Sequence, residues 1–449
     1  MSASDKKNMI VNSALWAAYG DALGFITELA DKKILKARIK KDRVDALECW
    51  TRKIGGMYGP SVDFPSGAYS DDTQLRLATS RSINKDGHFS VQSFSKIEMP
   101  VWQSYALGAG RGSKLAAANL AKKSTAWFGN FYKDSNTNYV NAGGNGGVMR
   151  IQPHIWSAKN TNDPNSYLLD VIKNTLSTHG HPRAIAGSVF HALTLASTIN
   201  NRKIPQCKDF HDFNQWTLKI PEIIRRDINL NTAWISVFEN AFGKSIEDAY
   251  QDVFDELNML IESTINWSHG RASYSSLVKV LDLKNPLIRG SGTQTAIAAS
   301  AASTLFGKMS LEELIIDISN ELGTDTDSIA TMVGAIVGLV TDIAPPQHIQ
   351  DQDYITLDAQ RLCSISQSQV EDILNYSYPN PLSWRSPSSA LDYVSKSDNK
   401  LLFEPFGIVT VKSKPLLVII LINIIMYING FNQVLDSLFL LKCGQKKLY

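Results

Sequence analysis

The sequence has few of the residues that build soft-metal sites and disulfide frameworks. Its four cysteines, at positions 49, 207, 363 and 443, form no CxxC pair, and most of its eight histidines are dispersed. Cysteine spacing therefore predicts neither a zinc site nor a disulfide framework. Scattered thiols fit a reducing compartment, and the first residues lack the charged start, apolar run and cleavage site of a signal peptide. We expect a cytoplasmic protein.

The sequence also lacks a large net charge, because positive and negative residues are nearly equal in number. The chain has 45 Lys and Arg residues against 43 Asp and Glu residues, which gives a formal net charge of +2. Because binding to a nucleic-acid backbone requires concentrated positive charge, no nucleic-acid partner is expected. Only residues 32–41 are locally basic, and such a run is typical of a solvated helix face or loop.

Long apolar runs are absent except near the C-terminus, at residues 416–428. This stretch has thirteen residues and contains Asn423, whereas a membrane-spanning helix needs about 20 apolar residues. We therefore expect a buried strand or a packing helix there rather than a membrane anchor. Membrane contact is not expected, although the role of this apolar segment is open.

The chain is rich in helical periodicity. With 44% hydrophobic and 20% charged residues it has the composition of a globular protein. Alternating strand patterns are scarce before residue 400, and no internal repeat is visible. An all-α fold is predicted, because apolar residues recur with the helical period in these segments: residues 7–23, 72–83, 91–107, 114–122, 182–197, 246–267, 293–306, 311–321 and 328–340.

Two acidic clusters lie about 250 residues apart, Ser70-Asp71-Asp72-Thr73 and Asp325-Thr326-Asp327-Ser328. Each opens a predicted helix, where free N–H groups and the helix dipole favour negative charge. Capping alone explains the first cluster, whereas aspartates at alternate positions after Gly323 exceed what a cap requires. The clusters supply only oxygen ligands, which favour Mg²⁺ or Mn²⁺ over zinc or copper. If the two helix starts face each other, they repel strongly unless a cation lies between them.

Three other motifs have both a functional and a structural explanation. The segment GDALG (20–24), followed by Glu28, contributes carboxylates, but its small residues also suit close helix packing. The glycine-rich segment GGNGGVMR (143–150) can cradle a diphosphate on bare N–H groups, although it matches neither the dinucleotide-binding nor the P-loop pattern. In THGHP (178–182), His179 can donate a hydrogen bond or transfer a proton. A structural histidine near a helix start is the alternative.

Taken in order, the motifs GDALGxxxE, YSDDTQL, GNGGVMR, THGHP and GTDTDSIATMVGAIVGL resemble the ADP-ribosylglycohydrolase family. This family includes the dinitrogenase-reductase-activating hydrolase and the ADP-ribosyl-acceptor hydrolases. The five motifs span roughly residues 8–345. The resemblance implies an all-α orthogonal multi-helix bundle with a dinuclear Mg²⁺ centre, in which Mn²⁺ can replace Mg²⁺, and an enzyme that hydrolyses a glycosidic bond of ADP-ribose.

The resemblance also implies roles for individual residues. Glu28 lies beside the metals and the scissile bond, and either Glu28 or Asp72 assists proton transfer. The implied metal ligands are Ser70, Asp71, Asp72, Asp325, Asp327 and Ser328. The residues implied to hold the diphosphate and the neighbouring ribose are Asn145, Gly146, Gly147, Val148, Met149 and His179.

Two positions depart from the family pattern. Ser328 replaces a commoner threonine and keeps the hydroxyl ligand. Thr324 replaces a commoner glycine, which puts the backbone geometry there in question, because glycine tolerates angles that threonine does not.

Domain boundaries follow from the same resemblance and from the loss of periodicity after Pro345-Pro346. We assign residues 1–345 to a catalytic domain, with residues 200–270 as an insertion, and residues 346–449 to a C-terminal extension of unknown role. The implied substrate is an ADP-ribosylated protein, first of all an arginine-linked one, or a related ADP-ribose conjugate. The sequence does not identify the linkage.

Three alternatives remain open at this point. The protein could bind ADP-ribose, or serve structurally, without catalysis. A Mg²⁺-dependent phosphatase fits the DxD spacing of Asp325 and Asp327, but its aspartates are expected after a strand, and residues 311–321 are predicted to be helical. An isoprenoid synthase uses DDxxD, and here the third aspartate is absent after Asp71-Asp72.

Overall fold

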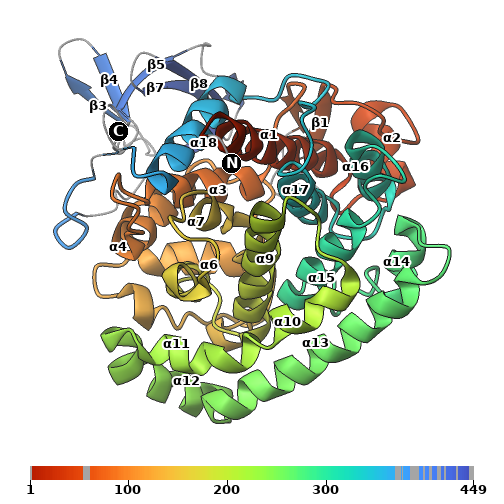
Figure 1. The fold of residues 1–449 in the computed structure, drawn as a ribbon. Coiled ribbons are helices and arrows are strands. Elements are labelled where there is room, and N and C mark those ends of the chain that lie inside the picture. The colour runs from red at the N-terminus through yellow and green to blue at the C-terminus, as the bar shows by residue number, and fades with distance from the viewer. Residues whose placement is uncertain are drawn as a thin grey trace.

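The computed structural model describes residues 4–53, 61–369, 376 and 378–384 in full, and the backbone of Ala3 and of six strands between residues 394 and 443. Helices form the bulk of the described chain (Figure 1). Their bounds are α1 Ala3–Thr27, α2 Lys32–Ile39, α3 Asp71–Arg81, α4 Val91–Ser93, α5 Met99–Trp102, α6 Arg111–Leu120, α7 Gln152–Trp156, α8 Leu168–Leu176, α9 Pro182–Asn201, α10 Phe210–Asn214, α11 Ile220–Arg225, α12 Ile235–Phe242, α13 Ile246–Ser268, α14 Tyr274–Val280, α15 Gly292–Ser303, α16 Leu311–Asn320, α17 Thr326–Val337 and α18 Gln352–Ser366.

Strands are few before the C-terminal region. β1 (Trp50–Lys53) pairs with β2 (Ser61–Phe64) in an antiparallel hairpin. A second antiparallel sheet has the order β3-β4-β5-β7-β6, with β8 paired to β7. Its strands are β3 Val394–Ser397, β4 Lys400–Phe403, β5 Gly407–Val411, β6 Leu416–Val418, β7 Leu421–Gly430 and β8 Gln433–Cys443. The apolar residues 416–428 therefore contribute to β6 and β7.

Every helix that the periodicity predicts is present, and the all-α fold is confirmed. One predicted helix is too long: residues 91–107 form α4, a π-helical turn and α5, and end at Trp102. Predicted caps are also present. Ser70 Oγ accepts a hydrogen bond from the Asp72 N–H at 3.2 Å, Pro182 stands at the first position of α9, and Ser310 forms a capping box with Glu313.

The helices α1 and α17 lie side by side in the middle of the fold (Figure 1). Their backbones touch because glycines occupy the crossing. A Cβ atom at Gly24 would lie 2.5 Å from the Cα atom of Asp327, and one at Gly334 would overlap the carbonyl of Trp16. Close packing therefore accounts for the small residues of the GDALG segment. α1 is long and apolar enough to cross a membrane, but 89% of its most apolar window is buried in the protein.

A second pair of helices, α9 and α15, crosses in the same way. A Cβ atom at Gly187 of α9 would overlap the carbonyl of Gly292 at the start of α15. α18 follows the boundary predicted near residue 345 and packs on α1. The segment 200–270, predicted to be an insertion, folds into α10 to α13 along the lower edge of the molecule in Figure 1.

Candidate active site

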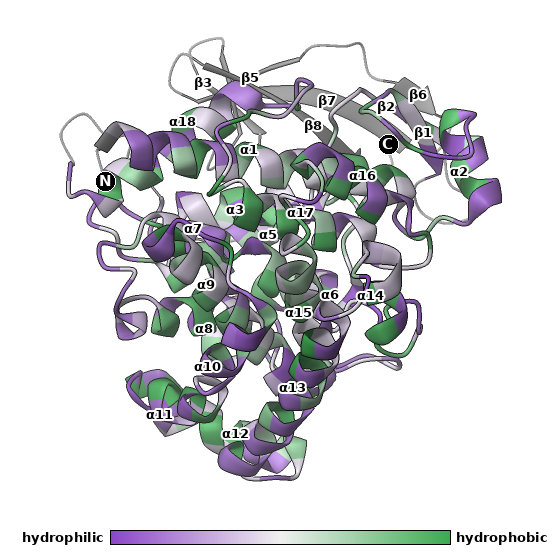
Figure 2. Cartoon of the chain, turned by 45° about the vertical axis from the view of Figure 1, so that its right-hand side comes forward, coloured by the Kyte–Doolittle hydropathy of each residue, from purple (hydrophilic) through white to green (hydrophobic). Residues whose placement is uncertain are grey.

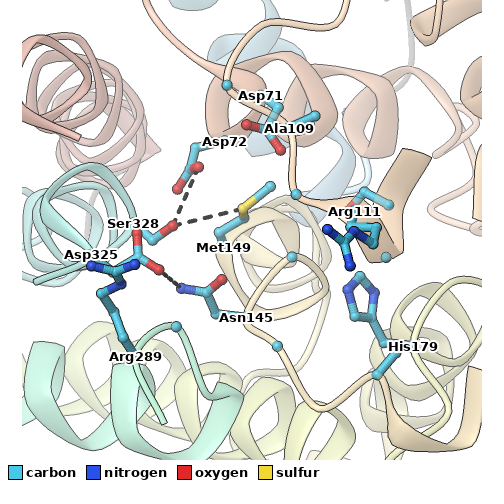
Figure 3. A pocket seen from close by; sticks show the side chains of 18 of the residues that line it. Asp71, Asp72, Ala109, Arg111, Asn145, Met149, His179, Arg289, Asp325 and Ser328 are labelled. Carbon is cyan, nitrogen blue, oxygen red and sulfur yellow. Dashed lines mark hydrogen bonds between the residues drawn. The ribbon is translucent and has the colours of Figure 1, made fainter. Parts of the chain in front are cut away.

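A cavity of about 560 Å³ opens where α1 ends and α3 and α17 begin. The glycine-rich segment 143–147 and the start of α6 form its other side. Figure 3 shows Asp71, Asp72, Ser328 and Asp325 on one side and Arg111 and His179 on the other, with Asn145 and Met149 between them. The lining includes Glu28, Asp71, Asp72, Asn145, Gly146, Met149, His179, Asp325, Asp327 and Ser328.

Both acidic clusters start helices that face this cavity. Ser328 Oγ lies 3.4 Å from Asp72 Oδ2, although the two residues are 256 positions apart. The Asp71 N–H donates to the carbonyl of Leu107 at 2.9 Å, which fixes the first turn of α3. The predicted juxtaposition of the two acidic helix starts is therefore present.

A further carboxylate, that of Asp21 on α1, lies behind the first cluster. It is fully buried and accepts hydrogen bonds from the N–H groups of Ser70 at 2.9 Å and Thr73 at 2.8 Å. Asp21 thus satisfies N–H groups that a helix start leaves free and holds α3 against α1. Asp21 belongs to the GDALG motif, but the sequence did not predict that it positions α3.

Burial raises the pKa of Asp71, Asp72 and Asp327 well above the usual aspartate range, and neighbouring carboxylates raise it further. Asp72 Oδ1 is buried and has no hydrogen-bond partner among the described residues. Among the residues that the structure describes, no three His, Cys, Asp or Glu side chains are close enough to hold one ion by themselves. Mg²⁺ takes one or two carboxylates and completes its shell with water or substrate oxygens, so the oxygen donors present fit a hard cation.

Glu28 stands just after the last turn of α1, at the edge of the cavity. Its Oε2 accepts a hydrogen bond from Arg52 Nη1 of β1 at 2.9 Å, and its carbonyl accepts one from Arg38 Nη1 of α2 at 2.9 Å. Burial raises the pKa of Glu28, and the Arg52 guanidinium partly opposes this rise. A carboxyl group with a raised pKa is suited to exchange a proton near neutral pH.

The glycine-rich segment is held by backbone pairing with residues 290–292. The Asn145 N–H donates to the Gly290 carbonyl at 2.8 Å, and the Gly292 N–H donates to the Gly143 carbonyl at 2.9 Å. Asn145 Nδ2 then donates to Asp325 Oδ2 at 2.9 Å, which joins this segment to the acidic side. A Cβ atom at Gly146 would lie 2.8 Å from Ser113 Oγ and 2.9 Å from Cε1 of the buried His179 ring, so a larger residue would displace His179.

His179 and Arg150 form one buried network beside the glycine-rich segment. Arg150 donates to the carbonyl of Gly146 at 3.0 Å and to Thr178 Oγ1 at 2.8 Å. Thr178 Oγ1 in turn lies 2.8 Å from His179 Nδ1. Burial, and then the Arg150 charge, lower the pKa of His179 to about 3. The imidazole at the cavity is therefore neutral at physiological pH.

Three predicted site residues lie behind the cavity lining. Ser70 is fully buried with its hydroxyl at the start of α3, Val148 is part of the hydrophobic core, and Gly147 packs on Thr175. The departure at Thr324 needs no special backbone, because the positive φ of +90° falls on Gly323 instead. Arg111 and Arg289, which line the cavity, and Arg52, which pairs with Glu28, had no motif to mark them.

The chain was compared with family models, curated proteins and solved structures. A family model described as ADP-ribosylglycohydrolase matches residues 3–367. No match was found among curated proteins. Among solved structures, an "ADP-ribosylglycohydrolase-related protein complex" matches 81% of this chain and 99% of its own chain, with 15% sequence identity and a TM-score of 0.49.

Proposed function

Because the chain belongs to the ADP-ribosylglycohydrolase family, whose members are hydrolases of ADP-ribose conjugates, we propose that it is a Mg²⁺-dependent enzyme that removes ADP-ribose from a modified protein side chain. Arginine-linked ADP-ribose is the first candidate. The family match supports the reaction class, whereas the metal and the linkage are our proposal.

One observation carries the proposal: two acidic helix starts far apart in the sequence meet at one cavity. Ser328 of α17 reaches Asp72 of α3, and the aspartates around them are buried with raised pKa values. A protein that needed only helix caps would not collect these carboxylates where they repel each other. A divalent cation offsets that repulsion.

We assign the cations to the oxygen donors of the two acidic clusters. Asp71, Asp72, Asp325 and Asp327 would hold two Mg²⁺ ions, with the hydroxyls of Ser70 and Ser328 nearby. Bound Mg²⁺ supplies the positive charge that orients a ribose diol and a water molecule.

The remaining residues act on the substrate directly. The bare N–H groups of Gly146 and its neighbours offer a cradle for a diphosphate, and the Nε2 atom of neutral His179 lies beside Gly146. Departure of the acceptor leaves positive charge on the ribose, which the buried carboxylates stabilise. Glu28 or Asp72, each with a raised pKa, holds or accepts the proton.

The competing assignments fit the site less well. A DxD phosphatase would carry Asp325 and Asp327 after a buried strand, whereas these residues follow α16 and the turn at Gly323. A protein that only binds ADP-ribose has no need of the buried acidic side. Retention of every acidic position favours catalysis.

The test is release of free ADP-ribose from matched peptides that carry arginine-linked or serine-linked ADP-ribose, in Mg²⁺ and in EDTA. We expect release that requires Mg²⁺ and is abolished by Asp327→Ala. Asp317→Ala, which removes a half-exposed aspartate of α16 that pairs with Arg43, is the matched control and should keep full activity. Tight ADP-ribose binding without release from any linkage would identify a binding protein instead.

A further inference from the structure

The locally basic segment that follows Glu28 forms an exposed helix beside the cavity. α2 begins at Lys32 and buries Leu35 and Ile39. Lys32, Lys33 and Lys36 remain exposed on its outer side. Figures 1 and 2 both place α2 at the rim of the molecule, and Figure 2 shows much of it as hydrophilic. Sequence alone favoured a solvated face here, with no functional role.

Specific contacts fix α2 to the mouth of the cavity. Arg38 Nη1 donates to the carbonyl of Ile26 at 2.6 Å and to that of Glu28 at 2.9 Å, which ties the helix to the end of α1. Leu29, which lines the cavity, connects Glu28 to α2. Lys32 and Lys33 follow Glu28 by four and five residues along the chain, so the start of α2 lies near this edge of the cavity.

Most of the positive charge on this helix is uncompensated. Lys36 lies 3.6 Å from Asp42, but among the described residues no carboxylate lies within salt-bridge distance of Lys32 or Lys33. Residues 28–53 contain nine Lys and Arg against five Asp and Glu residues, while the whole chain carries a net charge of only +2. This segment therefore carries a net charge of +4, from nine positive and five negative residues, which exceeds that of the whole chain.

We propose that α2 is a docking surface for an acidic polypeptide segment that flanks the modified residue of the substrate. This inference rests on the proposed function, since it names the class of acceptor that the same cavity receives. Two exposed apolar side chains support a polypeptide partner over a nucleic acid: Leu29 is 53% exposed and Ile34 is 40% exposed. Both can make apolar contacts with the side chains of a peptide, which a phosphate backbone does not offer.

The experiment uses two peptides that carry the same ADP-ribosylated residue, one flanked by Glu and Asp and the other by Ala and Gln. At about 10 mM salt, where the Debye length is about 30 Å, we expect the full-length protein to prefer the acidic peptide about 10-fold in kcat/KM. At about 150 mM salt, where this length is about 8 Å, the preference should shrink. Equal rates on the two peptides at low salt would overturn the proposal.

The decisive variant is Lys32→Gln/Lys33→Gln/Lys36→Gln, which keeps good helix-forming residues. We expect it to lose the preference for the acidic peptide and to hydrolyse the neutral peptide at the wild-type rate. Lys203→Gln/Lys208→Gln/Lys308→Gln is the matched control, because these exposed lysines lie beyond the ends of α9 and α15 that point away from the cavity. A preference that survives the α2 substitutions would refute the docking surface.

A binding measurement separates this proposal from the proposed hydrolase activity. Fluorescence anisotropy with the acidic peptide lacking ADP-ribose should show weak binding that the α2 variant loses and the control variant keeps. If this binding is seen and no peptide is hydrolysed, the docking surface stands and the hydrolase assignment fails. Absence of such binding, or tighter binding of a DNA duplex through the same lysines, would overturn the acidic-polypeptide partner.

Discussion

Burial shifts pKa values in opposite directions on the two sides of the cavity. The acidic side is formed by Asp71, Asp72, Asp325 and Asp327, and the glycine-rich side by residues 143–150 with His179. On the acidic side, burial raises the pKa of Asp71, Asp72 and Asp327. On the glycine-rich side, it lowers the pKa of His179 to about 3 and that of Arg150 to about 9. In both places the low-dielectric interior disfavours the charged form.

The two sides differ in how the protein offsets the free-energy cost of burying charged groups. Arg150 donates hydrogen bonds to Gly146, Asn174 and Thr178, so the buried positive charge of the glycine-rich side has its partners within the protein. Asp72 keeps a buried oxygen with no partner in the described chain. A cation bound as we propose would interact with this oxygen, whereas on the glycine-rich side the protein itself supplies the partners of the buried charge.

The largest effect is expected from Asp327→Asn on the acidic side. The change removes one proposed cation ligand, and kcat/KM for ADP-ribose release should fall about 10²–10³-fold, the size typical of losing one preorganised electrostatic contact. The metal-free variant should be at least as stable as the wild type, because a buried like-charge repulsion is gone. Steady-state kinetics and urea unfolding measure both. Equal activity with and without this carboxylate would remove the acidic side from the mechanism.

Gly24→Ala tests whether the acidic side depends on close helix packing. The new Cβ atom would lie 2.5 Å from the Cα atom of Asp327, so α1 and α17 must separate. We expect a loss of about 1–3 kcal/mol in the free energy of unfolding, as for overpacked cores, and a clear fall in kcat. Gly129→Ala is the control, because the nearest atom to its Cβ is 3.9 Å away. Similar unfolding curves for the two variants would contradict the packing role.

His179→Gln should have a smaller effect, confined to substrate binding. Loss of a hydrogen bond to the ligand is typically worth about 1–1.5 kcal/mol, which corresponds to about a 10-fold rise in KM. Because neutral His179 is not proposed to move the proton, kcat should change little. The KM and kcat of the variant separate these effects, and a fall confined to kcat would place His179 in the chemical step.

The last prediction concerns the pH dependence of stability, which differs between the buried histidines and the buried aspartates. His154, His179 and His191 have a pKa of about 3 in the folded protein, below the unfolded value of about 6.5. Their contribution to stability is present above pH 6.5 and is lost as the pH falls toward 3, with a limiting slope of about 1.4 kcal/mol per pH unit for each proton taken up.

The buried aspartates act in the opposite direction. Because their folded pKa values are raised, their contribution is present below the unfolded pKa near 4 and is lost as the pH rises through the folded values. In EDTA, stability should therefore decline on both the acid and the alkaline side. Mg²⁺ should restore the alkaline side alone. Urea unfolding from pH 4 to pH 9 tests this, and curves unaffected by Mg²⁺ would argue against a cation at the acidic side.

Sequence reasoning was strongest where the evidence is local. In the long helices α1, α13 and α17, apolar residues recur along the sequence itself. Ser70 and Ser310 cap their helices through hydrogen bonds to residues two and three positions further along. These signals place the acidic clusters at helix ends without any knowledge of the fold.

What the sequence did not reveal depends on partners distant along the chain. Asp21 caps α3 from 49 positions away, and Arg52 reaches Glu28 from a short hairpin with little strand pattern. α18 was missed because its apolar residues pack on α1 in a weakly periodic helix. The number of bound cations and the linkage that is cleaved stay predictions.

The crossing of α1 with α17 also sets the order of assembly. Gly24 and Asp327 belong to opposite ends of the helical region, so their contact closes a loop of about 300 residues, and contacts of such high sequence separation form late and slowly. During synthesis α1 leaves the ribosome first, and its apolar residues have no packing partner until α17 has also been synthesised. The carboxylates stay hydrated throughout that interval. A nascent chain that stops before residue 325 therefore contains Asp71 and Asp72 but lacks Asp325 and Asp327, and so has only half of the acidic side.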